Sequence, residues 1–363
     1  MAHVDRVLIR LLRVELAQPY KLSFATVLAF DTLLVELLLD DGTKGLGEAT
    51  ILTGYTDETV GECWRAAQDI AAQIRGKTAR EATDILTAWI PSNPFTATAF
   101  GTAFEMAADH PALRVVGNVP ILGVINTLEE KKLASEVEAL MKAGFKTLKV
   151  KVGWEVDPDL ARVGAVQQLL AGTDVNIRID ANQGFSPEDG VRFARSLSPD
   201  HVELFEQACD ADDWESAVAV KNAARVPIML DESIYDMADV ERAAKLQAAN
   251  LVKLKLMKLG SLTSLERALS RTKALGMQAV LGNGVATEIG CWMEACVAAV
   301  RLRDVAGEMN GFLKQKIPTL KNPLTIQKGA IVIPNGYLPE LDEKAVAAMQ
   351  VSSESFHRSN MRA

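Results

Sequence analysis

The feature that most constrains this chain is a regular alternation of short apolar runs and amphipathic segments that begins near residue 118. The apolar runs are VPILGVI, KTLKVKV, VNIRID, HVELFEQ, VPIMLDE, NLVKLKL and MQAVLGN. Segments such as LASEVEALMKAG lie between them, with helical spacing and a terminal glycine typical of a helix C-cap. Strands that alternate with helices build a parallel sheet with crossover helices. Because eight such units occupy roughly 250 residues in a closed barrel, the pattern favours an α/β barrel. An open doubly wound sheet is the alternative, but no Gly-rich phosphate loop follows the first strand.

The residues before position 118 follow a different pattern. DTLLVELLLDDGTKGLGEA predicts a hairpin of two strands joined at Asp41 and Gly42, and the Ala-rich residues 58–75 predict a helix. A chain of 363 residues is also long enough for about two domains. We therefore expect a separate α+β unit before the barrel.

Charged side chains stand at the carboxyl ends of five successive strand-like runs. They are Lys151, Asp180, Glu206, Asp231 and Lys255. The intervals between them are 29, 26, 25 and 24 residues, which is one strand–helix unit each time. In a barrel, these five side chains would surround the mouth at which such folds keep their active sites.

These residue types indicate a particular chemistry. Three adjacent carboxylates repel one another unless a hard cation such as Mg²⁺ binds their oxygens. A lysine must lose its proton to act as a base, and we expect the neighbouring Lys149 and Lys253, together with the metal, to lower the pKa of Lys151 and Lys255. Both extra lysines could instead be plain partners of the carboxylates, or lie in water on an edge strand.

A metal and two lysines suit removal of the proton next to a substrate carboxylate, because the metal stabilises the negative charge that develops. One lysine would remove the proton. The other would return it to the opposite face, which gives racemisation or epimerisation, or would assist loss of a β-substituent.

Several motifs together resemble the enolase superfamily, in the branch of muconate-lactonising enzymes and dipeptide epimerases. They are GLGEA at 45–49, AFEMAADH at 103–110, LKVKVG, RIDANQG, LFEQ, LDES and KLKLMKLG. The resemblance implies an N-terminal α+β capping domain at 1–117, a modified TIM barrel, (β/α)7β, at 118–325, and a C-terminal segment at 326–363 that returns to the cap. It implies Mg²⁺ on Asp180, Glu206 and Asp231, with Lys151 and Lys255 as the acid/base pair.

Further site residues follow from the same comparison. Those predicted to support the ligands are Lys149, Asn182, Gln207, Glu232 and Lys253. Those predicted to contact the substrate are Tyr20, Phe24, Tyr55, Asn283, Glu308 and Asn310.

The late strands depart from the family patterns. The segment MQAVLGNGVATEIG has no histidine, which disfavours the mandelate-racemase branch. Lactonising enzymes and acylamino-acid racemases carry a glutamate four residues before the glycine of the following helix, where Ala286 stands here, and Glu288 is displaced by two positions. Dipeptide epimerases carry Asp-x-Asp on the eighth strand to hold the substrate ammonium group, where this chain has Glu308 and Asn310.

We therefore expect a Mg²⁺-dependent enzyme that abstracts the α-proton of a small carboxylate substrate, and racemises or epimerises an amino-acid or dipeptide-like compound. A dehydratase or a muconate-type cycloisomerase on the same scaffold is the alternative. A Schiff-base aldolase belongs to another mechanistic class, because it needs one reactive lysine and no carboxylate set. A non-catalytic relative would have lost a ligand or a lysine, and this chain has lost neither.

Charge, apolar segments and cysteine content indicate which partners and which cellular location to expect. The net charge of −8 disfavours nucleic acid, which usually needs a basic face. MAHVDRVLIRLL is not a signal peptide, and prolines interrupt the uncharged residues 85–104, so we expect no membrane span. We expect buried free thiols at all four cysteines in a reducing cytoplasm, and the resemblance implies a homo-oligomer, a dimer or an octamer.

Overall fold

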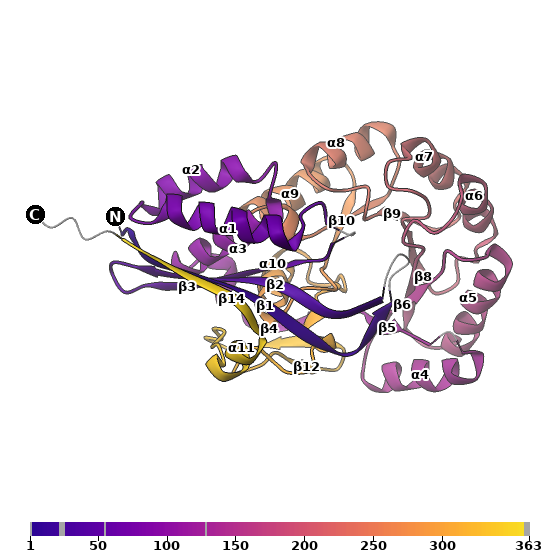
Figure 1. Ribbon diagram of the computed structural model, residues 1–363. Helices are drawn as coiled ribbons and strands as arrows, with labels where there is room; N and C mark the ends of the chain where they lie inside the picture. The colour runs from indigo at the N-terminus through magenta and orange to yellow at the C-terminus, as the bar shows by residue number, and fades with distance from the viewer. Residues whose placement is uncertain (1, 22–25, 54–55, 128, 359–363) are drawn as a thin grey trace, which may run out of the picture.

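The computed structural model describes residues 2–21, 26–53, 56–127 and 129–358 (Figure 1). One part is an antiparallel sheet with the strand order β14-β1-β2-β3. Its strands are β1 (Val4–Lys21), β2 (Thr26–Leu39), β3 (Lys44–Ile51) and β14 (Gln350–His357). The pairing of β2 with β3 confirms the predicted hairpin. The pairing of β14 with β1 brings the end of the chain back to its beginning.

Three helices accompany this sheet (Figure 1). They are α1 (Val60–Ile74), α2 (Ala79–Trp89) and α3 (Pro94–Ala107), and the short 3₁₀ helix η1 (Pro111–Arg114) follows. The Thr59 side chain accepts a hydrogen bond from the Glu62 backbone and Glu62 bonds back, so a capping box starts the predicted helix. Helix α3 packs directly on β3, because a side-chain carbon on Gly45 or Gly47 would lie 1.9 Å or 2.0 Å from a backbone oxygen of α3. The GLGEA motif is therefore a packing surface.

The second part is a parallel sheet of seven strands in sequence order. The strands are β5 (Gly123–Ile125), β6 (Thr147–Lys151), β7 (Asn176–Asp180), β8 (Val202–Glu206), β9 (Ile228–Leu230), β10 (Leu251–Leu254) and β11 (Gln278–Leu281). One helix follows each strand: α4 (Glu130–Lys142), α5 (Val156–Leu170), α6 (Pro187–Ser196), α7 (Trp214–Ala223), α8 (Met237–Leu246), α9 (Leu262–Ala274) and α10 (Glu288–Arg301).

A short segment after α10 joins the two edges of this sheet. The Glu308 amide donates to the Leu281 carbonyl at the end of β11, at 2.9 Å. On the other side, the Gly307 amide donates to Pro120 and the Gly307 carbonyl accepts from Leu122, both at 2.9 Å. Residues 307 and 308 thus take the place of an eighth strand, and the predicted (β/α)7β architecture is confirmed.

One predicted strand is divided. VPILGVI was expected to be a single barrel strand, but its first part belongs to β4 (Gly117–Pro120) and only its last part to β5. Strand β4 pairs with β13 (Ala330–Ile333), which pairs with β12 (Thr325–Gln327) in a separate small sheet. Proline at the end of β4 has no amide hydrogen to continue the ladder. The domain limits at 117 and 325 stay a prediction.

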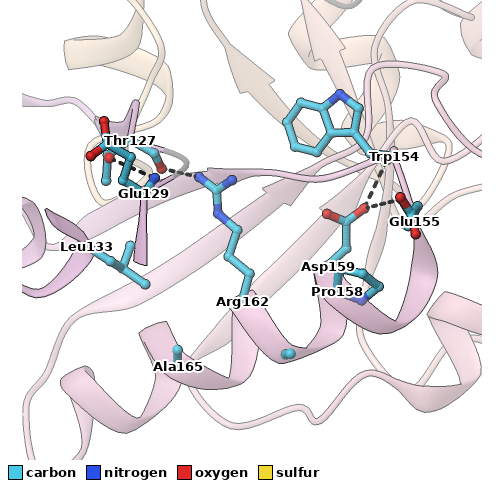
Figure 2. Close-up of a pocket in the computed structure, with 10 residues that line it drawn as sticks. Thr127, Glu129, Leu133, Trp154, Glu155, Pro158, Asp159, Arg162 and Ala165 are labelled. Atoms are coloured by element: carbon cyan, nitrogen blue, oxygen red, sulfur yellow. Dashed lines mark hydrogen bonds between the residues drawn. The ribbon is translucent and has the colours of Figure 1, made fainter. Parts of the chain in front are cut away.

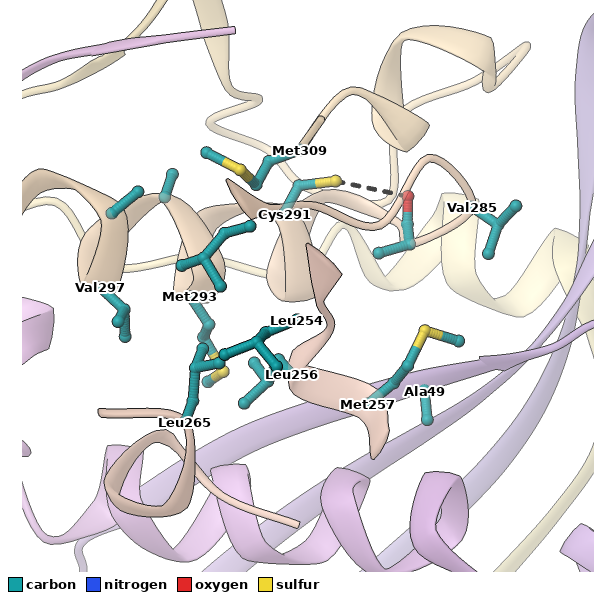
Figure 3. Packing of buried hydrophobic residues seen from close by; sticks show 14 of the residues in the cluster. Ala49, Leu254, Leu256, Met257, Leu265, Val285, Cys291, Met293, Val297 and Met309 are labelled. Atoms are coloured by element: carbon teal, nitrogen blue, oxygen red, sulfur yellow. Dashed lines mark hydrogen bonds between the residues drawn. The ribbon is translucent and has the colours of Figure 1, made fainter. Parts of the chain in front are cut away.

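The core is continuous between the sheet and the helices around α10. Figure 3 shows Leu254 and Leu256 packed near Met293 of α10, and Met257 beside Ala49 of β3. The remaining short elements are η2 (Leu256–Lys258), η3 (Gly311–Lys314) and α11 (Glu343–Met349). All four cysteines, which lie in the described ranges, are buried and form no disulfide, as predicted. In the described part of the chain, no helix has the length and apolar character that crossing a membrane requires.

Candidate active site

A small cavity opens at the carboxyl ends of the barrel strands. The charged residues that line it are Lys149, Lys151, Asp180, Asp231, Lys253, Lys255 and Glu308. They come from β6, β7, the ends of β9 and β10, and the closing segment. Four of the five predicted strand-end residues thus line one cavity, and the fifth, Glu206 at the end of β8, is buried and contacts Lys149 and Lys253. Lys149 and Lys253 have side chains that are only 2% and 3% exposed. The alternative of lysines on a solvated edge strand is therefore wrong.

Lys149 and Lys253 bridge the carboxylates. Lys149 Nζ lies 2.7 Å from Asp180 Oδ2 and 3.0 Å from Glu206 Oε2. Lys253 Nζ lies 2.5 Å from Glu206 Oε1 and 3.3 Å from Asp231 Oδ2. Burial lowers the pKa of Lys253, but the charges of the carboxylates outweigh this and hold it well above its ordinary value. Both lysines therefore act as fixed positive charges within the cluster.

The two predicted catalytic lysines lie in different environments. Lys151 Nζ is 2.6 Å from Asp180 Oδ2, and this charge outweighs the effect of burial and raises the pKa of Lys151. Lys255 Nζ is 2.6 Å from Asp231 Oδ1, yet burial and the neighbouring Lys258 lower the pKa of Lys255 well below its ordinary value. The raised pKa of Lys151 is opposite to the lowering predicted from Lys149 and the charge of a metal ion, and the metal's part in that lowering stays a prediction. For Lys255 its direction is confirmed, but its causes are burial and Lys258, not Lys253.

The three carboxylates predicted to hold Mg²⁺ stand at adjacent strand ends, where Asp180 is paired in register with Glu206. Within residues 2–21, 26–53, 56–127 and 129–358, no three Asp, Glu, His or Cys side chains converge closely enough to hold a metal ion. The donor chemistry fits a hard divalent cation, because the set offers only carboxylate oxygens. The bridging ammonium groups use those oxygens here, so a cation would have to displace them. The role of these carboxylates as metal ligands stays a prediction.

Three other predicted residues fix the loops around the carboxylates. Asn182 accepts a hydrogen bond from Lys151 and donates to Glu232 Oε1 at 2.8 Å. Gln207 Oε1 accepts the Asp231 backbone amide at 3.0 Å, and Gln207 Nε2 donates to the Ser233 hydroxyl. These contacts join the loops after β7, β8 and β9 into one network, which is the supporting position that the sequence predicted.

The predicted substrate contacts fall into three groups. Tyr20, Asn283 and Glu308 line the cavity. Asn310 is buried and is held by a hydrogen bond from Lys314 Nζ to its Oδ1, at 3.3 Å. Phe24 and Tyr55 lie outside the described residues.

Several buried ionisable groups near the site were not predicted. Lys258 Nζ donates to the Ile234 carbonyl at 2.8 Å and lies over the Tyr235 ring. Glu294 accepts the Leu256 amide directly after Lys255, at 2.6 Å. The signal for Lys258 was available, since it follows Lys255 by three residues in the helical turn η2. Glu288, the displaced glutamate, is the first residue of α10 and instead accepts hydrogen bonds from the backbone amide and the hydroxyl of Thr319, which follows η3 in the chain.

A larger hollow of about 400 Å³ lies elsewhere, between the loop after β5 and helix α5 (Figure 2). Trp154 and Arg162 stand on its two sides, and Asp159 accepts the backbone amides of residues 153–155. This hollow is larger than the lysine–carboxylate cavity, but neither the two predicted catalytic lysines nor the three predicted metal ligands line it. The smaller cavity is therefore the candidate active site.

Comparison with known proteins agrees with this geometry. The model of the "Enolase C-terminal domain-like" family matches residues 132–344, more than half of the chain. This chain belongs to that family. Within the enolase superfamily it lies in the branch of muconate-lactonising enzymes and dipeptide epimerases, as the motifs predicted.

Two curated relatives and two solved structures illustrate the similarity. L-Ala-D/L-Glu epimerase of Bacillus subtilis is 26% identical over 341 residues, which cover 88% of this chain and 92% of that protein. N-succinyl-L-Arg/Lys racemase of Bacillus cereus is 24% identical over 321 residues, which cover 84% and 86%. The structure of a dipeptide epimerase from Cytophaga hutchinsonii, complexed with Mg and D-Ala-L-Val, gives a TM-score of 0.87 at 22% identity, covering 97% and 99%. Muconate lactonizing enzyme from Pseudomonas fluorescens gives 0.88 at 23%, covering 96% and 99%.

Proposed function

We propose that this chain is a Mg²⁺-dependent racemase or epimerase that removes and returns the proton next to the carboxylate of an amino-acid or dipeptide-like substrate. The observation that carries the proposal is the placement of Lys151 and Lys255 on the wall of one cavity. Lys151 is the last residue of β6 and Lys255 directly follows β10, and three carboxylate-bearing strand ends lie between these two strands. Two amines on opposite sides of one carbon atom are what inversion at that carbon requires.

Lys151 and Lys255 would act as acid and base in turn. In one direction, Lys255 takes the α-proton and Lys151 donates a proton to the opposite face; in the other direction they exchange roles. Asn182 and Asp180 hold the Lys151 amine through hydrogen bonds. Asp231 holds the Lys255 amine at 2.6 Å. These contacts keep both nitrogen atoms directed at the cavity, which is the positioning that proton transfer needs.

Asp180, Glu206 and Asp231 would hold Mg²⁺, which when bound stabilises the negative charge that develops on the substrate carboxylate. The buried ammonium groups of Lys149 and Lys253 already balance part of the charge of these carboxylates. They therefore offset part of the repulsion among these carboxylates before a cation arrives.

The test is a proton-exchange screen in D₂O with Mg²⁺, which follows α-proton loss by NMR over amino acids, dipeptides, and N-acylated and hydroxylated analogues. We expect exchange that needs the metal and is lost on chelation with EDTA. Exchange that continues unchanged after chelation would contradict the metal requirement. Absence of α-proton exchange from every compound that binds would contradict the reaction class.

A dehydratase or cycloisomerase is the second candidate, which the likeness of the fold to the Pseudomonas fluorescens muconate lactonizing enzyme supports. NMR of the products in the same screen, with muconate-type compounds added, separates them. A racemase only inverts the α-carbon, whereas a dehydratase releases water and a cycloisomerase forms or opens a lactone ring. The aldolase alternative is disfavoured, because both candidate amines are paired with carboxylates. Borohydride with a carbonyl substrate would trap a Schiff base in an aldolase and leave this protein unmodified.

We further propose a cytoplasmic protein that assembles as a dimer or an octamer and binds neither nucleic acid nor membrane. Four buried thiols support the reducing location, and the net charge of −8 supports the absence of a nucleic-acid partner. Light scattering of the purified protein measures the assembly directly.

A further inference from the structure

The Glu308 carboxylate is already paired with two lysines of the protein, which it shares with Asp180, Glu206 and Asp231. Both of its carboxylate oxygens accept from Lys149 Nζ, at 3.1 Å and 3.0 Å. Lys253 Nζ donates to Glu308 Oε2 at 2.5 Å. The Glu308 backbone is fixed as well, because its amide bonds to β11 in the closing segment of the barrel. Two ammonium groups therefore already occupy the oxygens of this carboxylate, and a third cation would have to share or displace them.

A further ammonium group stands beside Glu308. Lys314 Nζ donates to the Gly284 carbonyl at 2.6 Å and to Asn310 Oδ1 at 3.3 Å, and it lies 4.7 Å from the centre of the Tyr20 ring. Gly284 and Tyr20 both line the cavity. Lys314 therefore places a positive charge directly behind this wall of the site.

The Glu308 carboxylate, the Asn310 amide and the Lys314 ammonium group all lie close to Gly284 on the cavity wall. A methyl group on Gly284 would lie 3.5 Å from Lys314 Nζ, 3.6 Å from Asn310 Oδ1 and 3.6 Å from Glu308 Oε1. An ammonium group of a substrate at this place would face Lys314 at short range and find Glu308 already paired. Burial lowers the pKa of Lys314 to about 8, which is still above pH 7, so this amine keeps its positive charge there and repels a second cation. An amide carbonyl or a carboxylate would be attracted instead.

We propose that the substrate carries no free ammonium group at this wall. It is an amino acid whose nitrogen bears a neutral or anionic acyl group, and Lys314 helps to select that acyl group. This inference rests on the proposed α-proton chemistry, since it names the substrate class of the same site. It also means that Glu308 does not bind a substrate ammonium group, and acts instead as the partner of Lys149 and Lys253.

The experiment compares two substrates that differ in one charge. L-Alanyl-L-leucine and N-propanoyl-L-leucine have the same length and the same leucine α-proton, but only the dipeptide carries the ammonium group. We expect the wild-type protein with Mg²⁺ to exchange the leucine α-proton of the propanoyl compound with a kcat/KM at least about tenfold higher. An equal or higher value for the dipeptide would overturn the proposal.

The Lys314→Met variant tests the residue. Removal of this ammonium group should shift the ratio of the two kcat/KM values toward the dipeptide by about tenfold. Lys316→Met is the matched control, because Lys316 pairs with Glu15 on the surface, two residues away, and its loss should leave the ratio unchanged. A ratio that is the same in Lys314→Met and wild type would contradict the role of Lys314.

A binding measurement separates this inference from the proposed reaction. Compounds with α-aminoisobutyrate in place of leucine have no α-proton and cannot react, so calorimetry reports recognition alone. Tighter binding of the propanoyl compound without exchange of its leucine analogue would support the substrate class and contradict the reaction. Equal or tighter binding of the dipeptide analogue, or no binding of the propanoyl analogue, would overturn the substrate class.

Discussion

The Glu48→Gln substitution should make the protein more stable at high pH, because Glu48 is a buried carboxylate between the cap and the barrel. It lies on β3, is 6% exposed, and accepts a hydrogen bond from the Thr287 hydroxyl at the start of α10. Burial raises the pKa of Glu48 from 4.5 to about 7, although the hydrogen bond from Thr287 opposes this. The charged form of Glu48 is therefore unfavourable in the folded state.

The sign and size of the effect follow from linkage. The pKa is higher in the folded than in the unfolded chain, so the contribution of Glu48 to stability is present below pH 4.5 and is lost as the pH rises to about 7. A difference of about 2.5 pKa units corresponds to about 3 kcal/mol of unfolding free energy as an upper limit. Glutamine keeps a carbonyl oxygen for Thr287 but has no charge to bury.

Urea denaturation at pH 5 and pH 8 measures this difference. We expect Glu48→Gln to be close to wild type at pH 5 and more stable than wild type at pH 8, by about 1–3 kcal/mol. Glu188→Gln, at an exposed position in the first turn of α6, should change stability by less than about 0.5 kcal/mol at either pH. A difference between Glu48→Gln and wild type that is the same at both pH values would refute the reasoning.

Three further predictions concern packing, charge and thiols. Gly47→Ala should lower the free energy of unfolding by about 1–3 kcal/mol in urea denaturation, because its new carbon would lie 2.0 Å from the Ala99 oxygen. Gly61→Ala meets open space in α1 and should not destabilise the protein. An equal effect of both substitutions would contradict the close packing. Lys253→Met should lower the melting temperature in EDTA, because it removes an ammonium group that pairs with buried carboxylates. Addition of Mg²⁺ should restore most of this loss. If Mg²⁺ raises the melting temperature of the variant no more than that of wild type, the ammonium group and the metal do not compete. The four cysteines should react with a thiol reagent only after denaturation, because they are buried, and rapid labelling of the native protein would contradict this.

The sequence was sufficient to predict the barrel fold and the charged residues at the ends of its strands. Side chains of a strand alternate between two faces, so the spacing of Lys149 and Lys151 placed both on one face. One strand–helix unit separates Lys151 from Asp180, and the parallel sheet then brings such strand ends together. Both inferences depend on periodicity, which a single sequence shows directly.

Other features depend on distances that no local pattern contains. The raised pKa of Lys151 results from its contact with Asp180, which is 29 residues away in the chain. Lys314 reaches the site wall because η3 turns it toward Gly284, and its only sequence signal is the four-residue spacing from Asn310. The division of VPILGVI follows from pairing with β13, which lies about 200 residues later and which the apolar pattern of the run does not show.

The most direct test of the account follows each enantiomer of a reactive substrate separately in D₂O with Mg²⁺, using Lys151→Ala and Lys255→Ala. If the two lysines act on opposite faces of the α-carbon, neither variant should interconvert the enantiomers. Each variant should still exchange the α-proton of one enantiomer, and the two variants should act on different ones. Racemisation that persists in either variant, or loss of exchange of the same enantiomer in both, would contradict the two-lysine mechanism.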